Sequence, residues 1–361
     1  PYGIHDVVVD GQVVPVTEEV VLKKPFGHLL HFKRAMPPRA QPQPRLLLVA
    51  PLSGHFATLL RDTVRTLLQD HDVYITDWVN ARDVSLRHGG FGLDDYVAYM
   101  IDFIAALGPG THVMAVCQPC VAALAATAIM AEDDHPAQPR SMTLMAGPID
   151  TRVQPTKVNE LAKGKPIEWF EKYMIATVPW PYPGVGRRVY PGFVQLYSFM
   201  SMNEGKHVDA HRRYFEDLVA GDGDGVEKHE QFYDEYLSVL DLTEEFYLQT
   251  IDIVFQQHLL PRGLLQHRGA TVDLTAITDI GLATIDGEMD DISGVGQTQA
   301  ADGLTPNIPD NRRLLYVQPK VVHYGVFNGR RFREEIYPRV RDFIAQNEAI
   351  SVVPERSASA A

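Results

Sequence analysis

Short apolar runs of strand length recur along this chain, and helical patterns separate the early ones. The runs lie at residues 46–50, 73–76, 112–116, 141–145, 280–285 and 314–317. Amphipathic helical spacing fills residues 56–68, 94–107 and 121–131. Continuous apolar strands that alternate with helices are typical of a mostly parallel sheet covered on both faces. The pattern therefore predicts an α/β chain with a doubly wound, mostly parallel sheet.

The alternation stops near Asp150 and resumes near Thr278, which divides the chain. We expect residues 1–150 to form the first part of the core, opened by an antiparallel hairpin that turns at Asp10-Gly11. Residues 278–350 would form its second part, and residues 351–361 a frayed C-terminus. Residues 151–277 favour a mainly helical cap, or lid, inserted over the carboxyl edge of the sheet, where open α/β folds bind ligands.

Composition narrows the partners that the chain can have. The formal net charge of −13 and the dispersed basic residues argue against nucleic acid. No apolar run approaches the roughly 18 residues of a membrane-spanning helix. The two cysteines indicate a reducing compartment rather than a disulfide-stapled secreted protein. Because the chain begins at Pro1, we expect a missing upstream segment, and secretion stays open.

The segment 112–123 ends an apolar run and opens an Ala-rich helix. Such a strand-turn-helix lifts a nucleophile above the sheet, and the helix N-terminus stabilises a thiolate. We assign the nucleophile to Cys120, in the place of the serine of a Gly-x-Ser-x-Gly motif, with Gln118 and Ala122 instead of the glycines. The backbone N–H of Val121 would then be the first oxyanion donor.

Two other interpretations of this segment stay open. Both cysteines, Cys117 and Cys120, could be buried apolar residues, which is common for free cysteine. Cys-Gln-Pro-Cys also matches a thioredoxin-like redox motif. That motif belongs near the start of a small domain, whereas here it follows more than a hundred residues of α/β pattern, so we rank it lower.

Two later segments supply a base and the group that orients it. Asp290 follows the run at 280–285, and His323 follows the run at 314–317. The chain order of nucleophile, acid and histidine is that of an α/β-hydrolase fold. Asp291 is an alternative acid, and Glu288 a more distant one. With 14 histidines in the chain, only the joint placement favours this assignment.

The turn after residues 46–50 is expected to supply a second oxyanion donor from the backbone of Leu52 or Ser53. His55 in the same turn is a weaker candidate base. The candidate substrate contacts are His55, Trp169, Trp180, Tyr182 and Tyr324. We expect no metal and no cofactor, because no zinc-binding motif and no Gly-rich phosphate loop occurs.

With these motifs in place, nearly the whole chain resembles the intracellular polyhydroxybutyrate depolymerases and, more distantly, the polyhydroxyalkanoate synthases. The resemblance lies in the segments 51–61, 74–80, 94–97, 116–121, 287–297 and 323–329. It implies an α/β-hydrolase fold with Cys120, Asp290 and His323 as catalytic residues. The synthases usually have Gly-x-Cys-x-Gly and a His directly after the Asp. This chain has neither, which favours the depolymerases.

The resemblance implies hydrolysis of ester bonds in poly(3-hydroxybutyrate) through an acyl-thioester, with thiolysis by coenzyme A as a variant. The alternatives are a synthase-like acyltransferase and a non-catalytic granule-binding protein. The implied partner is the polymer or its granule surface, in the cytoplasm. The hairpin and cap together offer a surface for a homodimer.

Overall fold

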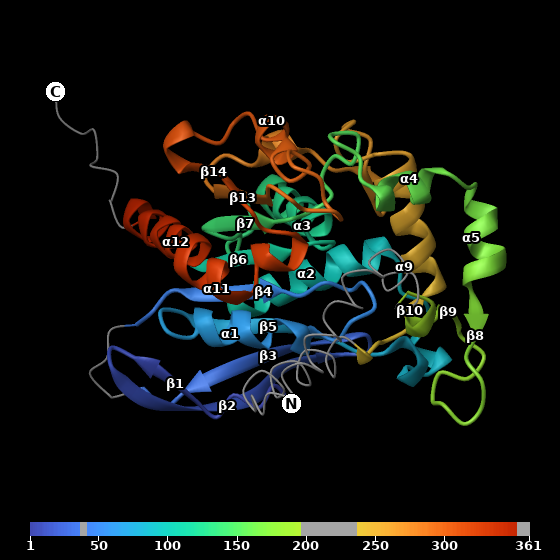
Figure 1. Cartoon of the computed structure of the whole chain (residues 1–361), viewed down its shortest axis with the longest axis horizontal. Coiled ribbons are helices and arrows are strands. Elements are labelled where there is room, and N and C mark those ends of the chain that lie inside the picture. The colour runs from blue at the N-terminus through green and yellow to red at the C-terminus, as the bar shows by residue number, and fades with distance from the viewer. Residues whose placement is uncertain (37–41, 196–236, 352–361) are drawn as a thin grey trace, which may run out of the picture.

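The computed structural model describes residues 1–36, 42–195 and 237–351 (Figure 1). Nine strands of this part form one sheet. In spatial order they are β1 (Asp6–Val9), β2 (Gln12–Lys24), β3 (Gly27–Arg34), β5 (Asp72–Trp78), β4 (Arg45–Val49), β6 (Thr111–Val116), β7 (Ser141–Met145), β13 (Gly281–Gly287) and β14 (Arg313–Gln318). All six strands predicted from apolar runs are present.

Strand direction changes across this sheet. The pairs β1–β2, β2–β3 and β3–β5 are antiparallel, whereas every pair from β5 through β4, β6, β7 and β13 to β14 is parallel. β1 and β2 form the predicted hairpin, with Asp10 and Gly11 both at positive φ. The carboxyl ends of the parallel strands meet at one edge, where ligands bind in open α/β sheets.

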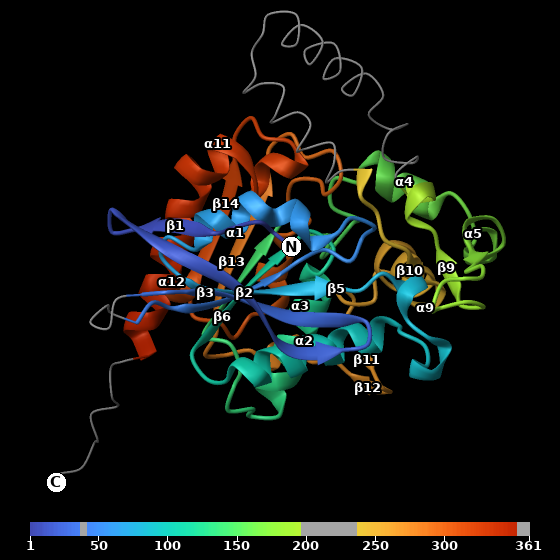
Figure 2. The same cartoon turned by 90° about the horizontal axis from the view of Figure 1, so that it is seen from below.

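Helices cover both faces of the sheet (Figure 2). α1 (Arg61–Leu67) and α12 (Tyr337–Ser351) lie on one side, and α2 (Leu93–Leu107) and α3 (Cys120–Glu132) lie on the other. The short helices α10 (Ala300–Leu304) and α11 (Gly329–Arg331) follow β13 and β14, respectively, along the chain. The predicted α/β-hydrolase fold is confirmed.

Burial explains why the central strands read as continuous apolar runs. Every residue of β6, β7 and β13 is buried, because helices pack on both faces. The outer strand β14 is largely half-buried instead. The core therefore lies between β4 and β13, directly beneath the edge that carries the candidate site.

The segment between β7 and β13 adds no strand to the main sheet within the described residues. It contains α4 (Lys157–Lys163), α5 (Ile167–Met174), β8 (Ala176–Thr177), β9 (Arg188–Tyr190), β10 (Leu242–Thr243), α9 (Glu244–Gln249), a π-helix (Thr250–Gln256), β11 (Gln266–His267) and β12 (Ala270–Thr271). The division into core and cap at residues 151 and 277 stays a prediction, as does the extent of helix, since residues 196–236 lie outside the described part.

At the end of the chain, α12 runs to Ser351, and residues 352–361 of the predicted frayed terminus lie outside the described residues. None of the helices in the described ranges combines the length and the apolar character needed to cross a bilayer.

The burial contrast between β4 and β14 predicts the effect of shortening a leucine in each. Leu47 in β4 is fully buried, whereas Leu315 in β14 is 48% exposed. Leu47→Ala should lower the free energy of unfolding by about 2–5 kcal/mol, because it leaves a cavity in close-packed core. Leu315→Ala should cost about 1 kcal/mol or less. Urea unfolding measures both, and equal losses would contradict this account.

Candidate active site

A strained turn at Cys117 joins β6 to α3. Cys117 has a φ of 68°, in the left-handed region that residues other than glycine rarely adopt. Such a conformation costs on the order of 1–3 kcal/mol and persists only where its surroundings impose it. Here the Cys117 N–H donates to the Met145 carbonyl oxygen at 2.7 Å, and the Cys120 N–H donates to the Cys117 carbonyl oxygen at 3.1 Å. The turn is therefore fixed from both sides.

Gly147 gives this turn the room it needs. A Cβ at Gly147 would lie 2.3 Å from Cys120 Cβ, 2.4 Å from Cys120 Sγ and 3.1 Å from the Cys117 carbonyl oxygen. Glycine is required there by close approach, because any side chain would push the turn and the first residue of α3 away from the sheet.

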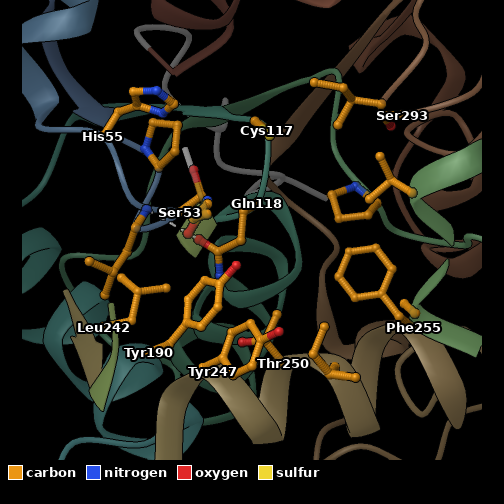
Figure 3. A pocket seen from close by; sticks show the side chains of 18 of the residues that line it. Ser53, His55, Cys117, Gln118, Tyr190, Leu242, Tyr247, Thr250, Phe255 and Ser293 are labelled. Atoms are coloured by element: carbon orange, nitrogen blue, oxygen red, sulfur yellow. Dashed lines mark hydrogen bonds between the residues drawn. The ribbon is translucent and has the colours of Figure 1, made fainter. Parts of the chain in front are cut away.

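The structure does not place Cys120, the nucleophile assigned from the sequence, at the cavity. Cys120 is the first residue of α3 and is fully buried, and its Sγ faces the carbonyl oxygens of Ala115 and Met145. Burial raises the pKa of the Cys120 thiol well above its ordinary value, which disfavours a thiolate. Cys117 is half-buried and lines a cavity (Figure 3). Cys117, not Cys120, contacts His323.

His323 and Asp290 meet as expected from the sequence. His323 Nδ1 lies 2.8 Å from Asp290 Oδ2, and both side chains are buried. The other carboxylate oxygen of Asp290 accepts the backbone N–H groups of Ile292 and Ser293 at 2.8 and 2.9 Å. With Nδ1 held by Asp290, His323 Nε2 is the ring nitrogen left to bond the Cys117 side chain.

The charge state of His323 is set by competing effects. Burial lowers the pKa of the imidazole, but the nearby Asp290 carboxylate and the Cys117 side chain raise it, and the pKa of His323 ends well above its ordinary value. Both neighbours therefore stabilise a proton on the imidazole, as a base that takes a proton from a thiol requires.

The two alternative acids take other positions. Glu288 accepts the Lys320 backbone N–H at 2.8 Å, and Asp291 is exposed. Neither makes the contact with His323 that Asp290 makes.

The position of Val121 bears on the expected oxyanion donors. Val121 lies inside the first turn of α3 and is not among the residues that line the cavity. The residue that follows Cys117 is Gln118, whose backbone N–H donates no hydrogen bond to the described residues. Leu52 and Ser53, the candidates for the second donor, both line the cavity. The Leu52 N–H donates to Gln118 Oε1 at 3.4 Å.

The cavity above Cys117 has a volume of about 430 Å³ and mostly apolar walls. Loops at the edge of the main sheet and the segment 151–277 both contribute to it. Its apolar and aromatic lining includes Leu60, Leu161, Trp169, Phe170, Met174, Tyr190, Leu242, Phe246, Tyr247, Ile251, Phe255, Tyr324 and Phe327. A cavity of this size and polarity suits a small apolar ligand or a segment of an apolar chain.

The predicted substrate contacts divide into two groups. His55, Trp169 and Tyr324 line the cavity. Trp180 and Tyr182 do not, because the loop between β8 and β9 turns them outward, and Trp180 is 83% exposed. Their role as substrate contacts stays a prediction. No group of three His, Cys, Asp or Glu side chains in the described ranges is arranged to hold a metal.

The sequence did contain a signal for Cys117. Cys117 is the first residue after the apolar run, and Pro119 marks the start of the following helix, since proline favours first-turn positions. A residue after that proline, such as Cys120, belongs to the helix and cannot stand on the turn. The small flanking residues of the motif are then Ala115 and Pro119.

Comparison with known families decides the membership of this chain. The model described as PHB de-polymerase C-terminus matches residues 146–348, which is more than half of the chain. The chain belongs to this family. The matched region contains Asp290 and His323 but begins after Cys117. No curated protein matches the chain.

Solved structures resemble the chain only distantly. A Bacillus megaterium epoxide hydrolase has 13% identity and a TM-score of 0.49, over 94% of this chain and 99% of that chain. A carboxylesterase of the thaumarchaeon Nitrososphaera gargenis has 11% identity and a TM-score of 0.45, over 96% of this chain and 99% of that chain. The thioesterase domain from the curacin biosynthetic pathway has 9% identity and a TM-score of 0.47, over 91% of this chain and 99% of that chain. Values this low carry no information on substrate or mechanism.

The contact between Asp290 and His323 predicts a shift in titration. Asp290→Asn removes the charge that raises the pKa of His323 and keeps the shape of the side chain. We expect the pKa of the imidazole to fall, because burial then acts without a carboxylate to oppose it. An NMR titration of labelled histidine measures it, with exposed Asp291→Asn as control. An unchanged pKa of His323 would refute this electrostatic account.

Proposed function

We propose that this chain hydrolyses ester bonds of poly(3-hydroxybutyrate), with Cys117 as nucleophile, His323 as base and Asp290 as orienting acid. One observation carries the proposal: a cysteine on a left-handed turn contacts a buried Asp–His pair at an apolar cavity. Membership of the PHB de-polymerase C-terminus family supports ester hydrolysis as the chemistry.

In the first step, His323 takes the proton of the Cys117 thiol, and the sulfur attacks the ester carbonyl carbon. The bond from that carbon to the alcohol oxygen breaks, and the alcohol leaves with the proton from His323. The acyl group is then held on Cys117 as a thioester. Asp290 keeps the ring oriented and stabilises its cationic form.

The oxyanion that forms in this step needs donors on the opposite side from His323. The backbone N–H of Gln118 and one from the turn at Leu52 or Ser53 are suited to this role, because the first follows the nucleophile and the second lines the same cavity. Donors held by backbone need no rearrangement when the charge develops.

In the second step, His323 takes a proton from water, and the resulting hydroxide attacks the thioester carbon. The carbon–sulfur bond breaks, the acid leaves, and Cys117 regains its proton. A thiol can replace water as acceptor and would give a new thioester, such as that of coenzyme A. The product of the reaction distinguishes these two acceptors.

The walls of the cavity support a weakly polar ester as substrate. Aromatic and aliphatic side chains surround the sulfur, and a charged substrate would lose its hydration there without compensation. A polyester repeat has ester oxygens and short alkyl groups but no charge. It therefore suits this lining better than a charged metabolite does.

The two cysteines predict opposite outcomes in the decisive test. Cys117→Ala should lower release of 3-hydroxybutyrate from amorphous polymer granules roughly 10⁴-fold or more, because it removes the attacking atom. Cys120→Ala should keep the rate within about threefold and lower the free energy of unfolding by about 1 kcal/mol, since it removes only a buried sulfur.

Loss of activity in Cys120→Ala with full activity in Cys117→Ala would refute this assignment. Polymer binding without release of acid in the wild type would favour the granule-binding alternative. Incorporation of hydroxyacyl thioesters into polymer would favour the synthase alternative. Mass spectrometry of acyl-enzyme trapped on short 3-hydroxybutyrate oligomers identifies the modified cysteine directly.

A further inference from the structure

The side chain of Gln118 connects two segments of the candidate site. Gln118 follows the proposed nucleophile, and its Oε1 accepts two hydrogen bonds. One comes from the Tyr96 hydroxyl at 3.0 Å, and the other from the Leu52 N–H at 3.4 Å. Figure 3 shows this side chain extending from the turn toward Ser53. The two backbone segments expected to supply oxyanion donors are therefore linked through one amide oxygen.

Tyr96 is a rigid anchor for this link. It lies in α2 and is fully buried. Its ring packs against Trp78 and Phe246, with centroids 4.9 and 4.8 Å away. Burial raises the pKa of its hydroxyl well above the ordinary value, so Tyr96 stays a neutral donor wherever the enzyme is assayed. The Leu52 N–H also lies within hydrogen-bonding reach of the Tyr96 oxygen.

We propose that Tyr96 is a positioning residue that acts with Gln118 to hold the Leu52 N–H toward the oxyanion formed at Cys117. This inference rests on the proposed ester hydrolysis. Without substrate, the amide oxygen satisfies an N–H in apolar surroundings and fixes the Leu52 turn relative to the Cys117 turn. A bond of 3.4 Å is long for an N–H donor, and a charged oxyanion is the stronger acceptor.

In this proposal the Leu52 N–H changes its acceptor from Gln118 Oε1 to the oxyanion with little movement. As negative charge develops on the substrate oxygen, Leu52 can bond to it while Tyr96 keeps Gln118 in place. This role gains importance only when an oxyanion forms, so the loss of Tyr96 should affect the chemical step rather than binding of the ester.

The test is Tyr96→Phe in the full chain, assayed on a soluble nitrophenyl ester of a short-chain acid. We expect kcat to fall roughly tenfold, with KM changed less than about twofold. Tyr99→Phe is the matched control. Tyr99 lies in the same helix, and its hydroxyl accepts the Phe26 N–H at 3.4 Å, away from the cavity. That variant should keep the wild-type kcat.

A second measurement separates this role from a structural one. Alkylation of Cys117 by iodoacetamide displaces iodide and forms no oxyanion, so Tyr96→Phe should leave its rate within about twofold of wild type. Equal losses in alkylation and in ester hydrolysis would overturn the proposal, because Tyr96 would then support the nucleophile or the fold. An unchanged kcat would also overturn it.

A double variant tests whether the two residues act together. Gln118→Met should lower kcat, and the addition of Tyr96→Phe should lower it by no more than about twofold further, since both residues act on the same N–H. If the reduction in kcat of the double variant equals the product of the reductions in the two single variants, the shared role is overturned. A wild-type chain without ester hydrolysis is a separate outcome, which overturns the proposed function itself.

Discussion

A cysteine held in the left-handed backbone conformation between β6 and α3 is the constraint on which the site depends. The turn exists because the buried strand and helix hold both of its ends, and because Gly147 leaves the space beneath it. This conformation exposes one sulfur to the cavity and buries the other in the core. Two cysteines three positions apart thus have opposite environments, since the helix begins at the second of them.

The Asp290–His323 pair depends on the same sheet edge. β13 and β14 are parallel neighbours, so the loops that follow them emerge side by side and bring an acid and a base together beside the Cys117 turn. Enclosure strengthens the interaction between these groups, since little water screens them. Burial is the largest single effect on the pKa of His323 and lowers it, but Asp290 and Cys117 together raise it above its ordinary value.

The apolar cavity explains why the proposed link from Tyr96 through Gln118 to the Leu52 N–H is needed. Apolar walls favour a weakly polar ester, but they also leave a backbone donor such as the Leu52 N–H without water. In the proposal, Gln118 and Tyr96 satisfy that donor and keep it oriented until the oxyanion forms. An ester hydrolase with an apolar cavity thus needs polar side chains that accept hydrogen bonds from the oxyanion donors while no substrate is bound.

The sequence by itself determined a doubly wound, mostly parallel sheet, because buried parallel strands must be apolar along their whole length. Its resemblance to the polyhydroxybutyrate depolymerases implied the α/β-hydrolase fold. It also favoured Asp290 as the partner of His323, because each follows such a strand and the strand ends share an edge, but it left Asp291 and Glu288 open as the acid. Only the tertiary structure showed that Asp290 contacts His323, that Cys117 lines the cavity while Cys120 is buried, and that Trp180 and Tyr182 lie away from the cavity. Residue spacing specifies periodicity and strand ends, whereas the direction of a side chain at a turn depends on backbone angles and on neighbours distant in the chain.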